Sequence, residues 1–437
     1  MKFIEVEIEK VAFGGAGFGH VDGKACFVPF ATPGDRVRAK VIKEKKSYLE
    51  AELVDLVAAS PTRIDPLCPV FGTCGGCSLQ QISYQQQLSV KEEMFAEQLW
   101  RFAKVDRSVI SPIQPAVNPW NYRTRVQVKL YWRDNSLLMG FFRGGTHFVV
   151  PFPGSCAISA PVVNNVITEL GHAVAASPEP DMIPQIDIAS GDDGETIIII
   201  HYIGNRPDVM SGYFSGSCRE SIPSVDGFWL QHGRKSTLKW IAGIERLSYK
   251  ISSLHGTNLR LSFSKGGFSQ VNYAQNQNLV RIACEMSGLT GKERVLDLFC
   301  GNGNLTLPLA LLSTETVGIE EYAPSIQDAR ENAAANGICN VSFTCSDAEA
   351  GVAGLVKAGE VFDVVVLDPP RTGAAEIMRF IPQLKPARVV YISCDPVTLA
   401  RDIAILKKLD YSVVRSVPVD MFPQTSHIES VSLLEQG

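Results

Sequence analysis

The C-terminal third of the chain alternates short apolar runs with segments of helical pattern, and this alternation restricts the possible folds more than any other feature. Runs rich in β-branched residues are typical of buried strands, and they occupy residues 295–299, 317–321, 362–367 and 389–393. Strands that alternate with helices form a parallel sheet with helices on both faces. We therefore predict a doubly wound α/β domain over residues 266–437.

Acidic residues and glycines stand at the ends of the first strands, in an order typical of nucleotide sites. Asp297 precedes the loop Cys300-Gly-Asn-Gly303, and Glu320 ends the next strand. An acidic residue about 20 positions after such a loop binds ribose hydroxyls. The loop lacks the three-glycine spacing that brings a helix end onto a pyrophosphate, so the pattern favours S-adenosylmethionine over a dinucleotide. Asp347, after the third strand, is placed to contact the adenine.

Three further polar residues stand at the ends of the later strands. One strand ends in Asp368-Pro-Pro, the strand 389–393 ends at Cys394, and Glu429 lies near the last strands. A buried cysteine is often only a small hydrophobe, and Glu429 alone could be a surface carboxylate. Because open α/β sheets bind ligands beyond the carboxyl ends of their strands, the three residues together predict a reactive site.

The composition gives the chain no general affinity for nucleic acid. At 437 residues the chain is longer than a single core supports, so two or three domains are expected. The 41 basic and 46 acidic residues give a net charge of −5, so any contact with nucleic acid must depend on local patches. The N-terminus lacks a signal-peptide core, and no apolar run approaches a membrane span. We expect a cytoplasmic protein whose 11 cysteines stay reduced or bind metal.

The first 59 residues have the pattern of a compact β unit. The segment 36–41 alternates basic with apolar residues, which puts Arg36, Arg38 and Lys40 on one face of a strand, and Lys43, Lys45 and Lys46 extend the stripe. A solvated edge strand would have the same pattern. The segments 17–20 and 33–35 resemble the TRAM domain, a small OB-like barrel that binds RNA. OB folds bind single-stranded nucleic acid on cationic, aromatic faces.

Three cysteines lie close together after this unit. Cys68, Cys74 and Cys77 surround the pair Gly75-Gly76. In a reducing compartment such thiolates can hold a soft metal or an iron–sulfur cluster, with the glycines letting the backbone fold closely around it. Four ligands are needed, and Cys156 is the candidate for the fourth. A zinc site would fit the same number of ligands.

A basic and aromatic strand is expected to follow. Arg123, Arg125, Gln127 and Lys129 alternate along residues 118–129 and share one face. Arginines interleaved with aromatic side chains suit phosphates and unstacked bases. The alternative, a salt-bridged surface strand, is weaker because Asp134 is the only acidic residue between 118 and 147.

The remaining segments complete a prediction of three domains. Residues 83–104 have helical spacing of apolar side chains, which indicates an amphipathic helix with a packing role. Residues 160–265 indicate a mixed α+β layer without evident chemistry. We predict an RNA-binding β-barrel over 1–60, a central α+β domain over 61–265 and the α/β domain over 266–437, with the helix free to pack outside the central domain.

Several motifs in this order resemble those of the RNA uracil-5 methyltransferases. The motifs are Phe268–Asn272, Asp297–Asn304, Leu367–Arg371, Ser393–Pro396, Thr398–Arg401 and His427–Glu429. With the TRAM-like start and the four cysteines, the chain most resembles the iron–sulfur branch that acts on 23S ribosomal RNA. Bacterial relatives that modify uridine 54 of transfer RNA typically lack both features, whereas some archaeal transfer RNA enzymes keep the cluster, so a transfer RNA substrate stays open.

This resemblance implies roles for individual residues. It implies a Rossmann-like S-adenosylmethionine-dependent domain in which Cys394 is the nucleophile and Glu429 the base, and a four-iron, four-sulfur (4Fe-4S) cluster. The implied cofactor contacts are Gln270, Phe299, Asn304, Glu320, Asp347 and Asp368, and the implied cluster ligands are Cys68, Cys74, Cys77 and Cys156. One departure is Asp395, where many relatives have asparagine. A carboxylate there is expected to disfavour the neighbouring thiolate.

Other classes fit the sequence less well. A DNA cytosine-5 methyltransferase has its nucleophile directly after a Pro-Pro pair, whereas Pro369-Pro370 and Cys394 are separate here. A small-molecule methyltransferase would not need the basic, aromatic N-terminal half. A non-catalytic iron–sulfur RNA-binding factor would not need both Cys394 and Glu429. We expect a monomer that binds RNA and no membrane.

Overall fold

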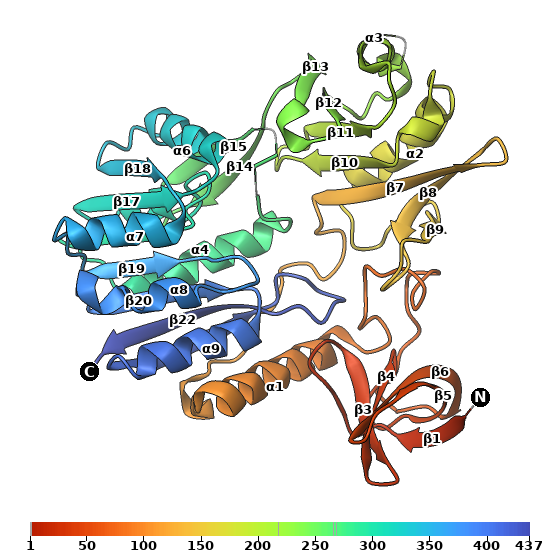
Figure 1. Cartoon of the computed structure of the whole chain (residues 1–437), viewed down its shortest axis with the longest axis horizontal. Coiled ribbons are helices and arrows are strands. Elements are labelled where there is room, and N and C mark those ends of the chain that lie inside the picture. The colour runs from red at the N-terminus through yellow and green to blue at the C-terminus, as the bar shows by residue number, and fades with distance from the viewer. Residues whose placement is uncertain (1, 217, 265, 268) are drawn as a thin grey trace.

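The computed structural model describes residues 2–216, 218–264, 266–267 and 269–437. Phe268, the first residue of one predicted motif, lies outside the described residues. Four sheets make up the β structure of the described chain, and they form three lobes (Figure 1). The N-terminal barrel lies at the lower right of this view, the central sheet at the upper right and the α/β layers at the left.

The N-terminal lobe is a six-stranded sheet in the order β1-β5-β6-β4-β3-β2. Its strands are β1 (Phe3–Glu7), β2 (Lys10–Val11), β3 (Ala16–Val21), β4 (Lys24–Pro29), β5 (Arg36–Glu44) and β6 (Tyr48–Ala58). Gly19 is required where β3 passes β1, because a Cβ atom there would lie 2.1 Å from the carbonyl oxygen of Glu7.

The basic strand of this lobe is β5, and the alternative of a solvated edge strand is wrong. β5 lies between β1 and β6, so both of its edges are hydrogen-bonded. Two residues of the basic stripe meet acidic residues of β6: Lys43 lies 2.7 Å from Glu50, and Arg38 lies 3.9 Å from Asp55. Part of the stripe is therefore neutralised within the sheet.

The predicted helix at 83–104 is α1 (Tyr84–Ala103), and it packs on the α/β lobe. Its N-cap is Ser83, whose hydroxyl accepts a hydrogen bond from the amide of Gln86 at 3.3 Å. Its buried face shares a core with helix α9 (Pro396–Lys407), and Figure 1 shows the two helices side by side. The α1 helix thus connects the N-terminal lobe to the layer that carries the C-terminal site.

The central lobe is a seven-stranded sheet in the order β13-β12-β11-β10-β7-β8-β9. Its elements are β7 (Arg125–Arg133), β8 (Ser136–Phe142), β9 (Val149–Pro151), α2 (Pro161–Ala175), β10 (Gln185–Ser190), β11 (Thr196–Tyr202), α3 (Pro207–Ser215), β12 (Gly227–His232) and β13 (Lys239–Gly243). The α2 and α3 helices share its apolar core. A two-stranded hairpin, β14 (Leu247–Ser252) and β15 (Asn258–Phe263), leads to the third lobe.

The α/β lobe has a seven-stranded sheet in the order β18-β17-β16-β19-β20-β22-β21. The strands are β16 (Arg294–Leu298), β17 (Glu315–Glu320), β18 (Val341–Cys345), β19 (Val364–Leu367), β20 (Arg388–Ser393), β21 (Tyr411–Val419) and β22 (Glu429–Gln436). The helices are α4 (Tyr273–Ser287), α5 (Thr306–Ala310), α6 (Ala323–Ala335), α7 (Ala348–Lys357), α8 (Ala375–Met378) and α9. The α5 helix after the turn that follows β16 is short, with 5 residues.

Burial on both faces explains the continuous apolar runs of these strands. Every residue of β19 is buried, and its side chains alternate between two cores. Val364 and Val366 face the core that includes α4 and α6, whereas Val365 and Leu367 face the core that includes α1 and α9. Among the described residues, no helix has the length and apolarity required to cross a membrane.

Candidate active site

The polar residues predicted from the sequence gather at one edge of the α/β sheet. The strands β16 to β20 run parallel, so the residues that follow them all emerge on the same side. Glu320 ends β17, Asp368 follows β19 and Cys394 follows β20. Between them the chain leaves β16 through the turn 299–303, where Phe299 has a left-handed φ of 64°.

The turn after β16 is held by a network of side-chain amides. The side-chain Oδ1 of Asn304 accepts hydrogen bonds from the Tyr249 hydroxyl at 3.1 Å and from Asn276 Nδ2 at 2.9 Å. Asn304 Nδ2 in turn donates to Asn276 Oδ1 at 3.0 Å. Tyr249 comes from β14 and Asn276 from α4. The hairpin before the domain therefore fixes the loop that is predicted to hold the cofactor.

Three carboxylates approach one another under this turn. Asp297 has no exposed surface, and its Oδ2 accepts a hydrogen bond from the Thr306 hydroxyl at 2.6 Å. Burial raises the pKa of Asp297 to about 7, and the neighbouring charges of Asp368 and Glu320 act in the same direction. Loss of water likewise raises the pKa of Asp368 to about 7. Asp297 and Asp368 are therefore only partly ionised near pH 7, and a cationic ligand beside them would favour their ionised, negative forms.

Two other predicted cofactor residues, Glu320 and Asp347, stand at or just after the ends of β17 and β18. The Glu320 carboxylate accepts hydrogen bonds from the amides of Gly301 at 3.3 Å and Tyr322 at 2.8 Å. Asp347 caps α7 by accepting from the amide of Ala350 at 2.9 Å. Gln270 is 8% exposed in the segment before α4.

Helix α9 anchors the loop after Asp368. The buried Asp402 carboxylate accepts from the Tyr391 hydroxyl and the amide of Ala374, both at 2.7 Å, while the Arg401 side chain donates to the carbonyl of Thr372 at 2.9 Å. The Asp-Pro-Pro loop and the cysteine at the start of α9 are thereby held by one helix.

The antiparallel strand β22 brings Glu429 to the residue next to Cys394. Ser393 of β20 pairs with Ser430 of β22, so the chain directions reverse and the positions just beyond this pair are Cys394 and Glu429. Glu429 is only 3% exposed, whereas Cys394 is half-buried. Sequence order placed Glu429 only near the last strands; its exact neighbour follows from this register.

Burial and neighbouring charges raise the pKa of both groups. Burial and, to a smaller extent, the charges of Glu429 and Asp368 together raise the pKa of the Cys394 thiol to about 12, and Arg371 opposes this shift. Burial and Asp368 also raise the pKa of Glu429, and Arg371 again opposes them. Arg371 is thus the cation of this site. The sequence alone assigned no role to Arg371, although this residue directly follows Pro369-Pro370.

Asp395, which was expected to disfavour the thiolate, also has a structural role. Its Oδ1 accepts hydrogen bonds from the amides of Val397 at 2.9 Å and Thr398 at 3.0 Å, so Asp395 is the N-cap of α9. The carboxylates with the largest effect on the pKa of Cys394 are Glu429 and Asp368. Aspartate and asparagine cap helices about equally well, which explains why either residue suits this position.

A neutral residue at 429 is expected to make Cys394 more reactive. Glu429→Gln removes a charge that raises the thiol pKa, and each unit by which that pKa falls increases the thiolate fraction about tenfold. Iodoacetamide should therefore label Cys394 faster in Glu429→Gln than in the wild type between about pH 8 and about pH 10. Mass spectrometry of the labelled peptides measures this, with the exposed Cys339 as internal reference. Equal labelling rates in the variant and the wild type would show that the charge of Glu429 does not act on the Cys394 thiol.

The four predicted cluster cysteines line one cavity of about 870 Å³. All 11 cysteines are free thiols. Burial, together with the other three thiols, raises the pKa of Cys77 to about 12. The Gln80 side chain donates a hydrogen bond to the Cys77 sulfur, and this bond opposes the rise in pKa. Backbone amides likewise donate to Cys68 and Cys74. In the described part of the chain, no three His, Cys, Asp or Glu side chains converge closely enough to hold a single metal ion.

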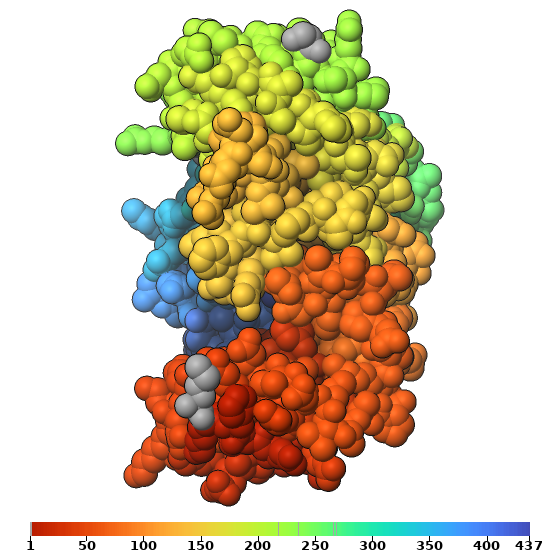
Figure 2. All heavy atoms as spheres, turned by 90° about the vertical axis from the view of Figure 1, so that its right-hand side faces the viewer, coloured from red at the N-terminus to blue at the C-terminus, as the bar shows by residue number. Residues whose placement is uncertain are grey.

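The same cavity connects the cysteines to the basic strand and to the loop that precedes Glu429. Arg123, Arg125, Gln127 and Lys129 line it, together with His427. In Figure 2 the blue C-terminal part of the chain comes into view between the red N-terminal lobe and the yellow central lobe. The local sequence led us to expect few acidic residues near the basic strand. This expectation is wrong, because β10 brings Asp187 opposite Gln127.

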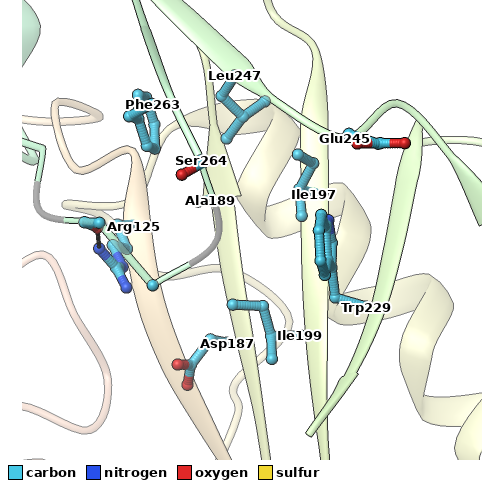
Figure 3. A pocket seen from close by; sticks show the side chains of 12 residues that line it. Arg125, Asp187, Ala189, Ile197, Ile199, Trp229, Glu245, Leu247, Phe263 and Ser264 are labelled. Atoms are coloured by element: carbon cyan, nitrogen blue, oxygen red, sulfur yellow. Dashed lines mark hydrogen bonds between the residues drawn. The ribbon is translucent and has the colours of Figure 1, made fainter. Parts of the chain in front are cut away.

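A second, smaller cavity lies between the central sheet and the β14–β15 hairpin (Figure 3). It has about 30 Å³ of space, and apolar side chains such as Leu247, Phe263 and Ile197 form most of its wall. Arg125 reaches its edge, where its guanidinium donates to the carbonyl of Gly267 at 3.0 Å. This volume suits about one water molecule, so the cavity cannot hold a nucleotide.

The sheet order and the polar residues at its edge define a Rossmann-like S-adenosylmethionine methyltransferase domain preceded by a TRAM domain. A family model described as tRNA (Uracil-5-)-methyltransferase matches residues 83–437, and a TRAM-domain model matches residues 2–54. The chain therefore belongs to the RNA uracil-5 methyltransferase family. Both resemblances drawn from the sequence are confirmed.

Similar proteins span the whole chain. The 23S rRNA (uracil(1939)-C(5))-methyltransferase RlmD of Alkalilimnicola ehrlichii is 36% identical over 99% of this chain and 96% of its own. An RlmD of Acinetobacter baylyi is 36% identical over 95% and 89%. The crystal structure of the Pyrococcus abyssi tRNA (uracil-54, C5)-methyltransferase with S-adenosyl-L-homocysteine has a TM-score of 0.76 over 99% of this chain and 100% of its own, at 24% identity, and shows the shared fold.

Proposed function

We propose that this enzyme transfers a methyl group from S-adenosylmethionine to C5 of a uridine in 23S ribosomal RNA. The observation that carries the proposal is the pairing of Cys394 with Glu429 at the strand ends, beside Asp368. The whole-length similarity to proteins named as 23S ribosomal RNA uracil-5 methyltransferases favours this substrate. The fold shared with an enzyme named for uracil 54 of transfer RNA makes transfer RNA the second candidate.

The chemistry accounts for a thiol and a carboxylate at this edge. Uracil C5 is a weak nucleophile, so Cys394 Sγ first bonds to C6, and the electron pair of the C5–C6 bond makes an enolate. The enolate C5 attacks the sulfonium methyl, and the carbon–sulfur bond breaks to leave S-adenosylhomocysteine. Glu429 then removes the C5 proton, the double bond reforms, and the Cys394 thiolate leaves C6.

Because the pKa of the Cys394 thiol is raised, the site must also favour loss of its proton. The thiol must lose its proton before it adds to C6, and burial together with Glu429 and Asp368 opposes this loss. The positive charge of Arg371, and of the sulfonium when it is bound, favours the thiolate. The negative potential around Asp297, Glu320 and Asp368 would thus discriminate the sulfonium donor from its neutral product.

The basic strand and the large cavity supply a path for RNA. The target uridine must leave its stack, at a cost of a few kcal/mol. The cavity extends from Lys129 on β7 to His427, two residues before Glu429. Lys129 stacks over the Phe142 ring at 5.0 Å, so this face combines positive charge with an aromatic surface. Because one chain contributes the whole site, we propose that it acts as a monomer.

We further propose that Cys68, Cys74, Cys77 and Cys156 hold a 4Fe-4S cluster. Four thiols that line one cavity form a donor set of suitable chemistry, and amide donors directed at the sulfurs are typical of such clusters. In a cluster each thiolate binds a different iron, so the four need not converge on one point as they must around zinc. When bound, the cluster would tie Cys156 of the central lobe to the loop that carries the other three cysteines.

Methyl transfer to defined RNA tests the proposed substrate. The protein is incubated with methyl-labelled S-adenosylmethionine and either 23S ribosomal RNA or transfer RNA, both lacking 5-methyluridine. We expect label in 5-methyluridine of the ribosomal RNA alone. Label in transfer RNA alone would make transfer RNA the substrate instead of 23S ribosomal RNA. Absence of label from both RNAs would contradict a catalytic role.

Loss of Glu320 is expected to weaken cofactor binding. Its carboxylate orders the amides of Gly301 and Tyr322 and ends β17, where ribose hydroxyls bind in such sheets. Loss of hydrogen bonds to a charged group costs about 1.5–3 kcal/mol, so Glu320→Ala should weaken S-adenosylmethionine roughly 10- to 100-fold. Calorimetry measures the affinity. The exposed neighbour Glu321 provides the control Glu321→Ala, and equal affinity for both variants would remove Glu320 from the pocket.

A further inference from the structure

We infer that Gln87 of α1 and Ser78 of the cysteine loop are positioning residues for Glu429, acting through the 420–427 loop. This loop joins β21 to β22 and delivers Glu429 to the site. The inference rests on the proposed function, because it concerns the step in which Glu429 removes the C5 proton.

Four successive carbonyl groups of the 420–427 loop are held by donors from elsewhere in the chain. The carbonyl of Met421 accepts from the Asn272 amide at 3.1 Å, that of Phe422 from the Lys91 ammonium at 2.9 Å, and that of Pro423 from the Tyr122 hydroxyl at 2.9 Å. The carbonyl of Gln424 accepts from the amides of Ser78 at 3.0 Å and Leu79 at 3.1 Å. A loop that otherwise connects two strands is therefore fixed from outside its own sheet.

Gln87 and Gln424 form a reciprocal amide pair at the centre of this arrangement. The backbone N–H of Gln424 donates to Gln87 Oε1, and the side-chain Nε2 of Gln87 donates to Gln424 Oε1, both at 2.9 Å. Gln87 Nε2 also donates to the carbonyls of Leu79 at 3.0 Å and Ile82 at 3.1 Å. Gln424 has a left-handed φ of 68° and is 1% exposed. This backbone conformation is unfavourable for glutamine, so the surrounding bonds must maintain it.

An ion pair fixes the start of the same loop. Lys91 Nζ lies 2.5 Å from Asp420 Oδ1, and neither side chain has exposed surface. A buried pair of this kind is weak evidence for net stability, but it specifies one arrangement because either charge alone would be costly. Lys91 lies one helical turn after Gln87, so one face of α1 holds both ends of the segment 420–424.

The cysteine loop reaches the base through this segment. Ser78 directly follows Cys77, its hydroxyl accepts from the amide of Ser426 at 3.0 Å, and Glu429 stands three residues further on. Cys394, in contrast, is held by β20 and α9. Loss of the Gln87 or Ser78 contacts should therefore displace the base and leave the nucleophile in place.

The step-specific test uses RNA with tritium at C5 of its uridines and labelled S-adenosylmethionine. Gln87→Leu keeps the size of the side chain and removes its hydrogen bonds, and Gln85→Leu is the matched control because Gln85 is exposed on the same helix. We expect Gln87→Leu to release tritium at least fivefold more slowly and to accumulate the methylated protein–RNA adduct. Gln85→Leu should match the wild type in both measurements.

Two comparisons decide between the possible results. If Gln87→Leu loses adduct formation and tritium release in equal proportion, or equals the wild type, the inference is overturned. If Gln87→Leu does not fold, as judged by thermal unfolding, Ser78→Ala is measured by the same criteria and decides alone. Glu429→Gln is assayed in parallel: if it accumulates no adduct, the mechanism in the proposed function fails. If Glu429→Gln accumulates the adduct and Gln87→Leu does not, only the positioning role is removed.

Discussion

Glu429→Gln is expected to trap a protein–RNA adduct that carries the transferred methyl group, whereas Cys394→Ala is expected to bind RNA and form no adduct. Glutamine keeps the shape of the side chain and cannot accept the C5 proton, so attack and methyl transfer proceed while release stops. Alanine removes the sulfur that bonds to C6, so no step begins. Turnover should fall by at least about 1,000-fold in both variants, because each removes a group that takes part in the reaction.

Denaturing gel electrophoresis with labelled RNA and labelled cofactor distinguishes the two variants. A slowly migrating species that contains both labels is expected for Glu429→Gln only. The double variant should form no adduct, which controls for attachment through another thiol. Normal turnover of Glu429→Gln, or 5-methyluridine produced by Cys394→Ala, would make the mechanism wrong for this chain.

Protein purified without oxygen is expected to contain about four irons and about four sulfides per chain. The donor set is the four thiols that line the large cavity, so Cys77→Ser should remove most of the iron and sulfide and the brown colour. Metal binding of this kind contributes to folding, so the variant should also unfold at a lower temperature.

A matched variant separates this effect from a general sensitivity of thiols. Cys339 is exposed and lies before β18, outside the cavity, so Cys339→Ser should keep the full iron content. About one zinc per chain without sulfide would replace the cluster by a zinc site. Iron that survives Cys77→Ser unchanged would assign the metal to other residues.

The parts of the site that could be predicted from the sequence are those set by local pattern. Asp368 and Cys394 each follow a run of buried residues, and Asp297 is the last but one residue of such a run, so the strand and the polar residue at its end are visible together. Parallel strands bring such residues to one edge. The spacing of the first three cysteines is likewise a local signal, although the cluster role of all four cysteines was a proposal and remains one.

The parts that could not be predicted depend on pairing between distant segments. Whether β5 is an edge strand depends on β1 and β6, and whether Gln127 has an acidic neighbour depends on the register of β10. The contacts of Gln87 with Gln424 join positions 337 residues apart. A buried glutamine carries no local pattern that would reveal its partner.

The order of strands in the α/β sheet has a consequence for how the molecule assembles. β21 touches the sheet only through β22, which inserts between β20 and β21. β21 and β22 are consecutive strands, whereas β16 pairs with β19 across two intervening strands, and pairing of distant segments is slow because chain entropy is lost first. The hairpin that ends in Glu429 can therefore form before the half of the sheet predicted to bind the cofactor. We expect amide hydrogens of β21 and β22 to gain protection earlier in refolding than those that join β16 to β19.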